Sequence, residues 1–155
     1  SVFLSLTGEE SEVGKMAKSQ LKTTLPWDVQ KVWQMVTDAE GYSWRSDLSR
    51  VEVLDGTRFI EYGTDGTATA FTVTRSEPYH RWEFDIENNN MKGHWIGIFT
   101  PEDHGTAIEF IEEMMVKKFW LRPLIKAYLR KQQTRFVADL KAALEQGDDI
   151  SCAQF

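Results

Sequence analysis

The stretch TTLPWDVQKVWQMVTDAEGYSWRSDL, residues 23–48, decides the fold class of this chain. It begins as the end of an alternating segment, AKSQLKTTL at residues 17–25, and this alternation predicts a β-strand. Pro26 suits the first turn of a helix, and the apolar residues after it recur at three- and four-residue spacing. Two short helices are therefore expected before the next strand, with Gly41 ending the helical region.

A long run of strands follows these helices. From Ser49 to Lys117 the apolar residues alternate with a period of two, which is typical of strands with one buried face. Turn sequences rich in Asp, Asn and Gly divide the run into consecutive hairpins. The six segments are RVEVLD (50–55), TRFIEYG (57–63), TATAFTVTRSE (67–77), RWEFDIE (81–87), MKGHWIGIFT (91–100) and TAIEFIEEMMVKK (106–118). Together with the first strand they predict an antiparallel sheet of seven strands.

The last segment, residues 119–145, predicts a long helix. Pro123 fits in its first turn, and Gly147 is expected to end it. The apolar residues on its one broad face are Leu121, Leu124, Ile125, Tyr128, Leu129, Phe136, Leu140 and Ala143. The order of elements fits one domain over residues 16–147. Residues 1–15 are expected to be an extension, native or artificial, and residues 148–155 a C-terminal tail.

Composition limits the classes of partner. The net charge is −6 and the pI is near 5.1, which argues against a nucleic-acid partner, because phosphate binding needs a basic surface. Between Lys117 and Arg135, however, seven residues are basic and none is acidic. Such a run could favour a membrane surface or an anionic ligand, and a solvated helix face is the simpler interpretation.

The lengths of the apolar runs and the number of cysteines indicate the cellular compartment and the kind of membrane contact to expect. No apolar run approaches the ~20 residues that span a bilayer, so no stable membrane insertion is expected. Residues 1–15 are too acidic, and their apolar part is too short, for a signal peptide. The single cysteine, Cys152, cannot form an internal disulfide, which indicates a reducing, cytoplasmic setting.

Four motifs in order carry a resemblance to a known family. They are LPWDVQKVWQMVTD, the turn YSW, the strand GTAIEF and the helical run YLRKQQTRFVADLKAAL. Over residues 17–146 the chain resembles the START-like superfamily, also called SRPBCC, which includes polyketide cyclases/dehydrases and lipid binders. The resemblance implies an α+β helix-grip fold, in which a curved seven-stranded antiparallel sheet wraps around the long C-terminal helix. It also implies a deep cavity between them, with the early helices closing one end of the concave face.

Strand parity then selects the apolar residues that would line such a cavity. The candidates are Phe71, Trp82, Phe84, Trp95 and Phe110 from the strands. Phe136 would join them from the helix. By the resemblance, Trp44 would be a wall or lid at the cavity mouth. The alternative for any one of these aromatic residues is ordinary core packing.

Polar residues on the same faces are more informative, because their burial is costly without a partner. Glu61 and Glu112 could bind a polar end of a ligand or act as acid and base, or could reach solvent or pair with Arg58 or Arg75. Gln132 lies at the centre of the helix's apolar stripe. It could face a wet cavity or bond to a strand carbonyl or a buried water.

Two further polar side chains complete the set of candidates. Tyr128, one turn before Gln132, could present its hydroxyl to the same space. Arg45 could offer its charge to an anionic ligand, and a surface ion pair with Asp47 is the favoured interpretation.

The sequence thus predicts binding of a small, mostly hydrophobic ligand, lipid- or polyketide-like, in an internal cavity. A polyketide cyclase/dehydrase-type enzyme is the first alternative and a protein-interaction module is the second. No metal site or cofactor is expected, because His80, His94 and His104 lack metal-ligand spacing and nucleotide-binding motifs are absent. Catalysis and oligomeric state are left open.

Overall fold

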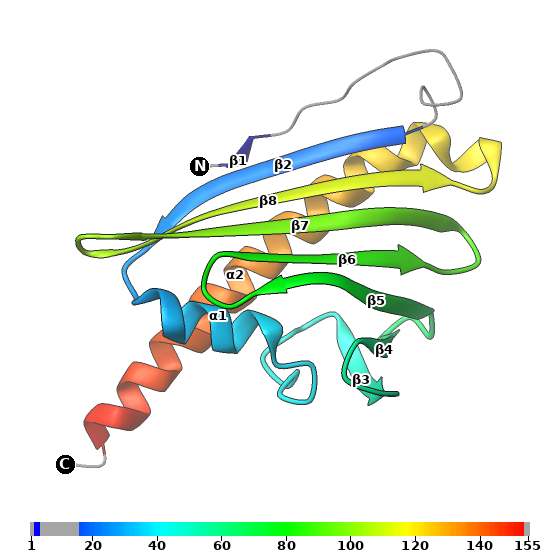
Figure 1. Cartoon of the computed structure of the whole chain (residues 1–155). Helices are drawn as coiled ribbons and strands as arrows, with labels where there is room; N and C mark the ends of the chain where they lie inside the picture. Colours follow the sequence, from blue (N-terminus) through cyan, green and yellow to red (C-terminus); the bar gives the residue numbers. More distant parts are fainter. Residues whose placement is uncertain (1, 4–15, 154–155) are drawn as a thin grey trace.

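The structure is a computed structural model of the whole chain, and it describes residues 2–3 and 16–153, with side chains described from residue 16 to residue 147. One antiparallel sheet is crossed on a single face by a long helix, with a shorter helix at one end (Figure 1). The seven predicted strands are all present. They are β2 (Met16–Leu25), β3 (Leu48–Val53), β4 (Arg58–Gly63), β5 (Ala68–Glu77), β6 (Arg81–Glu87), β7 (Met91–Glu102) and β8 (Gly105–Val116).

The sheet order is β1-β2-β8-β7-β6-β5-β4-β3, so the strands after β2 form a meander whose last member pairs with β2. Leu21 lies opposite Phe110 in that closing pair. A two-residue strand that was not predicted, β1 (Val2–Phe3), pairs with the free edge of β2. Register shifts in β3 and β5 mark irregularities of the kind that bend a strand and increase its twist.

Helix α1 (Val29–Thr37) begins later than the sequence suggested. Asp28 is its N-cap, and the Asp28 carboxylate accepts a hydrogen bond of 3.0 Å from the Lys31 amide. Pro26 therefore lies outside the helix. Buried Trp33 packs edge-to-face on Phe99 at 5.0 Å between ring centroids, which places α1 against the end of the concave face.

The prediction of two short helices after the first strand is wrong, since only α1 is present between β2 and β3. The chain leaves the helix at Asp38, whose backbone is extended and whose carboxylate accepts a hydrogen bond from the Gly41 amide at 3.1 Å. A turn closed by the Arg45 amide and the Tyr42 carbonyl follows. These local bonds satisfy the backbone without a second helix.

The long helix α2 (Arg122–Ala153) follows a short 3-10 turn, η2 (Phe119–Leu121), and Pro123 lies in its first turn as predicted. The prediction that Gly147 ends this helix is wrong, because the helix continues through it to Ala153. Glycine inside a helix costs only about 1 kcal/mol, so one glycine does not force a stop. No helix in the described part of the chain combines the length and apolarity needed to cross a membrane.

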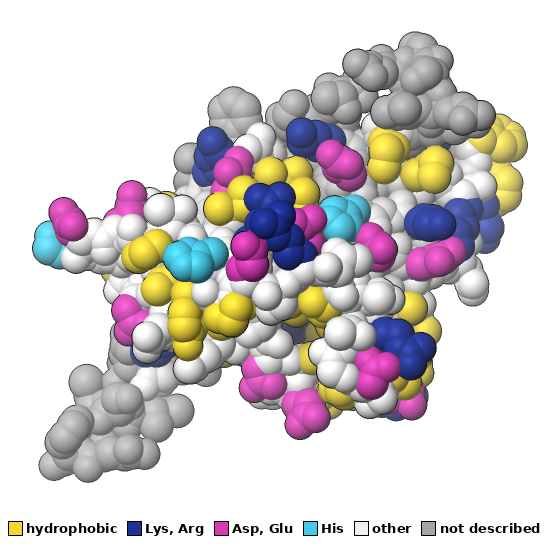
Figure 2. All heavy atoms as spheres, viewed as in Figure 1, with side chains coloured by type: hydrophobic (Ala, Val, Ile, Leu, Met, Phe, Trp, Pro, Cys, Tyr) yellow, Lys and Arg dark blue, Asp and Glu magenta, His cyan; other side chains and the backbone are white. Residues whose placement is uncertain are grey.

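The two faces of the sheet differ in chemistry. On the outer face His94 bonds to Glu83 at 2.8 Å and to Asp85 at 2.7 Å, and Arg81 also pairs with Glu83. Acidic, basic and histidine side chains gather on this face in Figure 2. The inner face carries the core that packs beneath α2. The most completely buried apolar side chains of this core are Leu21, Leu25, Ile108 and Phe110 from the sheet, Val32 from α1, and Leu129, Leu140 and Leu144 from α2.

Gly97 in β7 makes room for aromatic rings on the inner face. A Cβ atom at this position would lie 2.6 Å from the Trp95 ring and 3.3 Å from Phe99. The Trp95 ring is itself stacked on Phe84, with 4.7 Å between centroids, so it has little freedom to move away.

We predict that Gly97→Ala lowers the free energy of unfolding by about 1–3 kcal/mol, as overpacking of a filled core does. Urea denaturation measures the change. Gly56→Ala is the matched control, since a Cβ at Gly56 meets nothing within 4 Å, and its effect should stay within about 0.5 kcal/mol. Equal losses in the two variants would contradict the packing argument.

Candidate functional site

A cavity of about 460 Å³ lies between the inner face of the sheet and helix α2. All eleven residues that the sequence selected line this one space. They are Trp44, Glu61, Phe71, Trp82, Phe84, Trp95, Phe110, Glu112, Tyr128, Gln132 and Phe136. The structure brings them together, and their part in ligand binding stays a prediction.

The floor of the cavity is a continuous series of aromatic rings across the strands. Phe59 stacks on Phe71 with 5.0 Å between centroids, and Phe71 meets Phe84 edge-to-face at 5.2 Å. Phe84 then stacks on Trp95, which contacts Phe110 at 4.9 Å. Each ring packs against the next one along the sheet. The rings therefore form a closed floor, and the space above them is the cavity.

The wall on the helix side continues the same series. Phe136 of α2 packs edge-to-face on Phe110 at 5.6 Å and on Trp44 at 5.3 Å. Trp44 therefore closes one side of the cavity as a wall.

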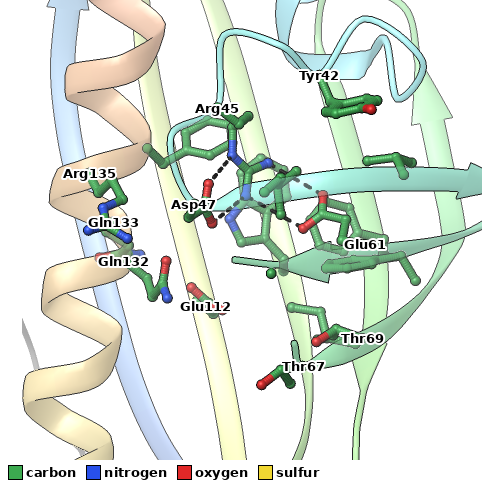
Figure 3. Close-up of a pocket in the computed structure, with 18 of the residues that line it drawn as sticks. Tyr42, Arg45, Asp47, Glu61, Thr67, Thr69, Glu112, Gln132, Gln133 and Arg135 are labelled. Atoms are coloured by element: carbon green, nitrogen blue, oxygen red, sulfur yellow. Dashed lines mark hydrogen bonds and ion pairs between the residues drawn. The ribbon is translucent and has the colours of Figure 1, made fainter. Parts of the chain in front are cut away.

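Arg45 lies inside this wall, with its guanidinium bonded to two carboxylates (Figure 3). It donates two hydrogen bonds of 3.0 Å to Asp47 and longer ones of 3.4 and 3.5 Å to Glu61. The expected pair with Asp47 is present, but the prediction that it lies on the surface is wrong. The side chains of Arg45, Asp47 and Glu61 are only 15–16% exposed.

Two connections hold the Trp44–Asp47 segment in this position. The Ser46 amide and hydroxyl both donate to the Asp139 carboxylate of α2 at 2.8 Å. The Thr64 amide donates to the Asp47 carbonyl at 3.0 Å, which ties the segment to the turn after β4. The loop is thus fixed between helix and sheet, and Arg45 is directed into the gap between them.

The partner of Glu61 also differs from the two arginines considered from the sequence. Arg58 pairs with Asp55, and Arg75 pairs with Glu77 and Glu83 on the outer face. Burial raises the pKa of Glu61, and the nearby Arg45 charge only partly opposes that rise. For Arg45, burial alone would lower the pKa, but the charges of Glu61 and Asp47 outweigh it and raise the pKa.

Glu112 is the least compensated charge of the site. Burial raises the pKa of Glu112 to about 7, with Arg45 opposing the rise and Glu61 adding to it. Among the described residues no side chain or amide donates a hydrogen bond to its carboxylate. A carboxyl with a pKa near neutrality exists in both protonation states, so it can donate or accept a proton.

Tyr128 and Gln132 stand near this carboxyl on α2. Burial and the Glu112 charge raise the pKa of Tyr128, while a hydrogen bond with Gln132 acts in the opposite direction. Tyr128 remains 40% exposed, so it sits where the cavity opens. Gln132 faces the cavity and not a strand carbonyl, as one of the two interpretations of the sequence proposed (Figure 3).

The sequence reasoning missed Gln133, which is only 4% exposed and lines the cavity beside Gln132. The Gln133 amide donates a long hydrogen bond of 3.4 Å to the Ser19 carbonyl. Its Oε1, like the indole Nε1 of Trp44, is buried without a hydrogen-bond partner in the part of the chain that the structure describes. The four-residue step from Leu129 to Gln133 was a signal that could have placed it inside.

Metal binding has no support in this site. Within residues 2–3 and 16–153 no three His, Cys, Asp or Glu side chains come together in a way that could hold a metal ion.

Comparison with known proteins agrees with the resemblance seen in the sequence. The family model described as polyketide cyclase/dehydrase and lipid transport matches residues 16–145. The chain belongs to this family. None of the curated proteins compared matches the sequence significantly.

Solved structures share the fold at low sequence identity. A conserved protein from Geobacillus kaustophilus superposes with a TM-score of 0.74 at 12% identity, over 83% of this chain and 95% of that one. A START superfamily protein from Mycobacterium smegmatis gives 0.70 at 14% identity, over 84% and 97%. DynU16, a protein of the dynemicin biosynthetic locus, gives 0.68 at 19% identity, over 84% of this chain and 48% of that one.

The buried Glu112 carboxyl makes stability depend on pH. A carboxyl whose pKa is higher in the folded than in the unfolded protein stabilises the fold only while protonated, so stability falls as pH rises. With the pKa raised from 4.5 to about 7, that loss accumulates between those values and reaches at most about 3 kcal/mol.

We predict that Glu112→Gln matches the wild type below this window and exceeds its free energy of unfolding above it. Urea denaturation across the pH range measures the difference. The control is Glu113→Gln, because the next residue on a strand points to the opposite face. A Glu112→Gln effect of equal size at all pH values would contradict the assignment.

Proposed function

We propose that this protein binds a small, mostly hydrophobic molecule, lipid- or polyketide-like, inside the cavity. The observation that carries the proposal is a space of about 460 Å³ with an aromatic floor and a few polar groups at one side. Small-molecule sites usually occupy ~300–1,000 Å³ and have this mixture of apolar walls and convergent polar groups. Membership of a family described by polyketide cyclases/dehydrases and lipid transport supports the same class of ligand.

The buried charges indicate which polar end the ligand carries. Asp47 and Glu61 supply two negative charges around the one positive charge of Arg45, and Glu112 adds negative charge when ionised. A ligand carboxylate would meet this excess of negative charge after losing its water, which is unfavourable. A hydroxyl, phenol or amine can donate a hydrogen bond to Glu61 or Glu112. We therefore expect a neutral or cationic ligand.

Dye displacement tests both parts of the proposal. Nile red, which is neutral and apolar, should bind and become fluorescent, and a medium-chain alcohol should displace it. The fatty acid of equal chain length should displace it at least about tenfold less well above pH 7, because its carboxylate is ionised. Preference for the acid would contradict the charge argument.

Two matched variants locate the binding in the cavity. Thr69 lines the cavity, so Thr69→Trp should weaken Nile red binding at least about tenfold by filling space. Thr72 lies on the same strand with its side chain exposed, so Thr72→Trp should bind like the wild type. If both variants bind Nile red like the wild type, the dye binds outside the cavity.

Glu112 also favours a second candidate function, a cyclase/dehydrase-type enzyme. Its pKa of about 7 and its position near Tyr128 are what proton transfer to a folded ketide chain would require.

Cyclisation of a synthetic poly-β-ketone thioester, followed by absorbance, tests the enzyme. Glu112→Gln should lower the rate by ~10²-fold or more while Nile red displacement by the substrate stays unchanged. Tyr128→Phe should give a smaller loss. Absence of turnover in the wild type, with substrate bound, would leave binding as the function.

The alternative of a protein-interaction module predicts a largely closed interior, because such a protein would need no ligand cavity. The cavity argues against that requirement. The same alternative also predicts an exposed apolar patch, and Phe119, Trp120 and Leu124 are exposed.

A further inference from the structure

The 3-10 turn η2 and the first part of helix α2 carry two rows of apolar side chains instead of one. Ile125 and Leu129 belong to the buried row that packs in the core. Trp120, Leu124 and Tyr128 form a second row at four-residue spacing, and they are 60%, 62% and 40% exposed. A helix that only covered a core would carry polar residues on this second row.

Phe119 extends the exposed row at the turn between β8 and α2. It is 73% exposed and packs edge-to-face on Trp120, with 5.6 Å between centroids. Hydrophobic and basic side chains lie side by side at this end of the molecule in Figure 2. Phe119, Trp120, Leu124 and Tyr128 together are called the docking patch.

Positive charge surrounds the docking patch in a chain whose net charge is −6. Exposed Lys118, Arg122 and Lys126 flank it, and within the described residues none of the three takes part in an ion pair. Lys117 is already paired with Glu87 at 2.8 Å. Acidic charge also reaches Tyr128, the member of the patch that lines the cavity, from Glu112, Asp65 and Asp47.

The docking patch leads directly to the opening of the cavity. Tyr128 belongs to the patch and also lines the cavity, and exposed Lys131 follows it on the rim. An apolar molecule that leaves the cavity past Tyr128 therefore meets the exposed apolar residues Leu124 of α2 and Trp120 of η2.

We propose that the docking patch binds the surface of a membrane that contains anionic lipids. Tryptophan, phenylalanine and leucine with a rim of lysine and arginine are the residues that lie in the interface of such membranes. A second copy of this chain fits less well, because a twofold contact would bring the two basic rims together. Docking itself is independent of the proposed function. The further idea that docking brings the cavity opening to the lipid rests on the proposed function.

Vesicle co-sedimentation of the full chain tests the proposal. Vesicles of phosphatidylcholine with about one-third phosphatidylserine should bind at least about tenfold more tightly than pure phosphatidylcholine, and high salt should remove the difference. Trp120→Ser combined with Leu124→Ser should weaken binding by about tenfold or more. Arg122→Gln combined with Lys126→Gln should lower only the phosphatidylserine component, by about fivefold per charge.

The control removes exposed apolar residues elsewhere. Val53→Ser with Leu54→Ser changes two exposed positions at the β3–β4 hairpin, and vesicle binding should stay unchanged. Equal loss in this control, or no preference for phosphatidylserine, would overturn the proposal. A dimer in sedimentation velocity that Trp120→Ser with Leu124→Ser abolishes would also overturn it, by assigning the patch to a second copy.

Nile red uptake from solution keeps the two proposals separate. The patch variants should take up dye like the wild type, since their side chains at 120 and 124 lie outside the cavity lining. Wild-type protein that binds vesicles but takes up no dye would remove the proposed function and leave docking supported.

Discussion

The buried charge of Arg45 is the constraint on which the site depends. A guanidinium taken out of water is tolerated only if carboxylates surround it, and Asp47 and Glu61 do so from the loop and from β4. This pairing, with the tie from Ser46 to Asp139, fixes the segment between α2 and the sheet. Trp44, Arg45 and Asp47 of this segment line the cavity.

The cavity therefore has two chemically different sides. The aromatic floor is rigid because each ring packs on the next, from Phe59 to Phe136. The polar side holds more negative than positive groups, and Glu112 lacks any hydrogen-bonding partner among the described residues. The Glu112 carboxyl lowers the free energy of unfolding at high pH. Such a loss of stability is common where a group binds a ligand or takes part in a reaction. The two sides together suit a ligand with one apolar body and one hydrogen-bond donor.

Much of the architecture was predictable because alternation, turns and the long apolar stripe are local patterns that strongly limit backbone geometry. The strands followed from alternation and turn sequences. Parity grouped Phe71, Phe84 and Phe110 by face, and the family resemblance placed that face toward a cavity. The wrong predictions concern the second short helix, the end of α2 and the position of Arg45. In these places local sequence signals were weak or contacts between distant residues determined the structure. Asp38 ends α1, and its carboxylate accepts a hydrogen bond from the Gly41 amide. Gly147 lies inside α2, which continues to Ala153. The burial of Arg45 depends on Glu61, sixteen residues away, and no spacing rule reveals such a pairing.

The two halves of α2 have different roles. Beyond residue 136 the helix is an ordinary core element, whose Leu140 and Leu144 are fully buried against the sheet and α1. Before residue 136 it carries exposed Leu124 and Tyr128 and an amide, Gln132, that faces the cavity. Its basic Arg122 and Lys126 form no ion pair within the described part of the chain. An exposed apolar row and polar side chains turned toward the interior are unfavourable for the stability of a folded domain. Their concentration on the first half of one helix, beside the cavity opening, is what a functional surface requires and a structural role does not explain.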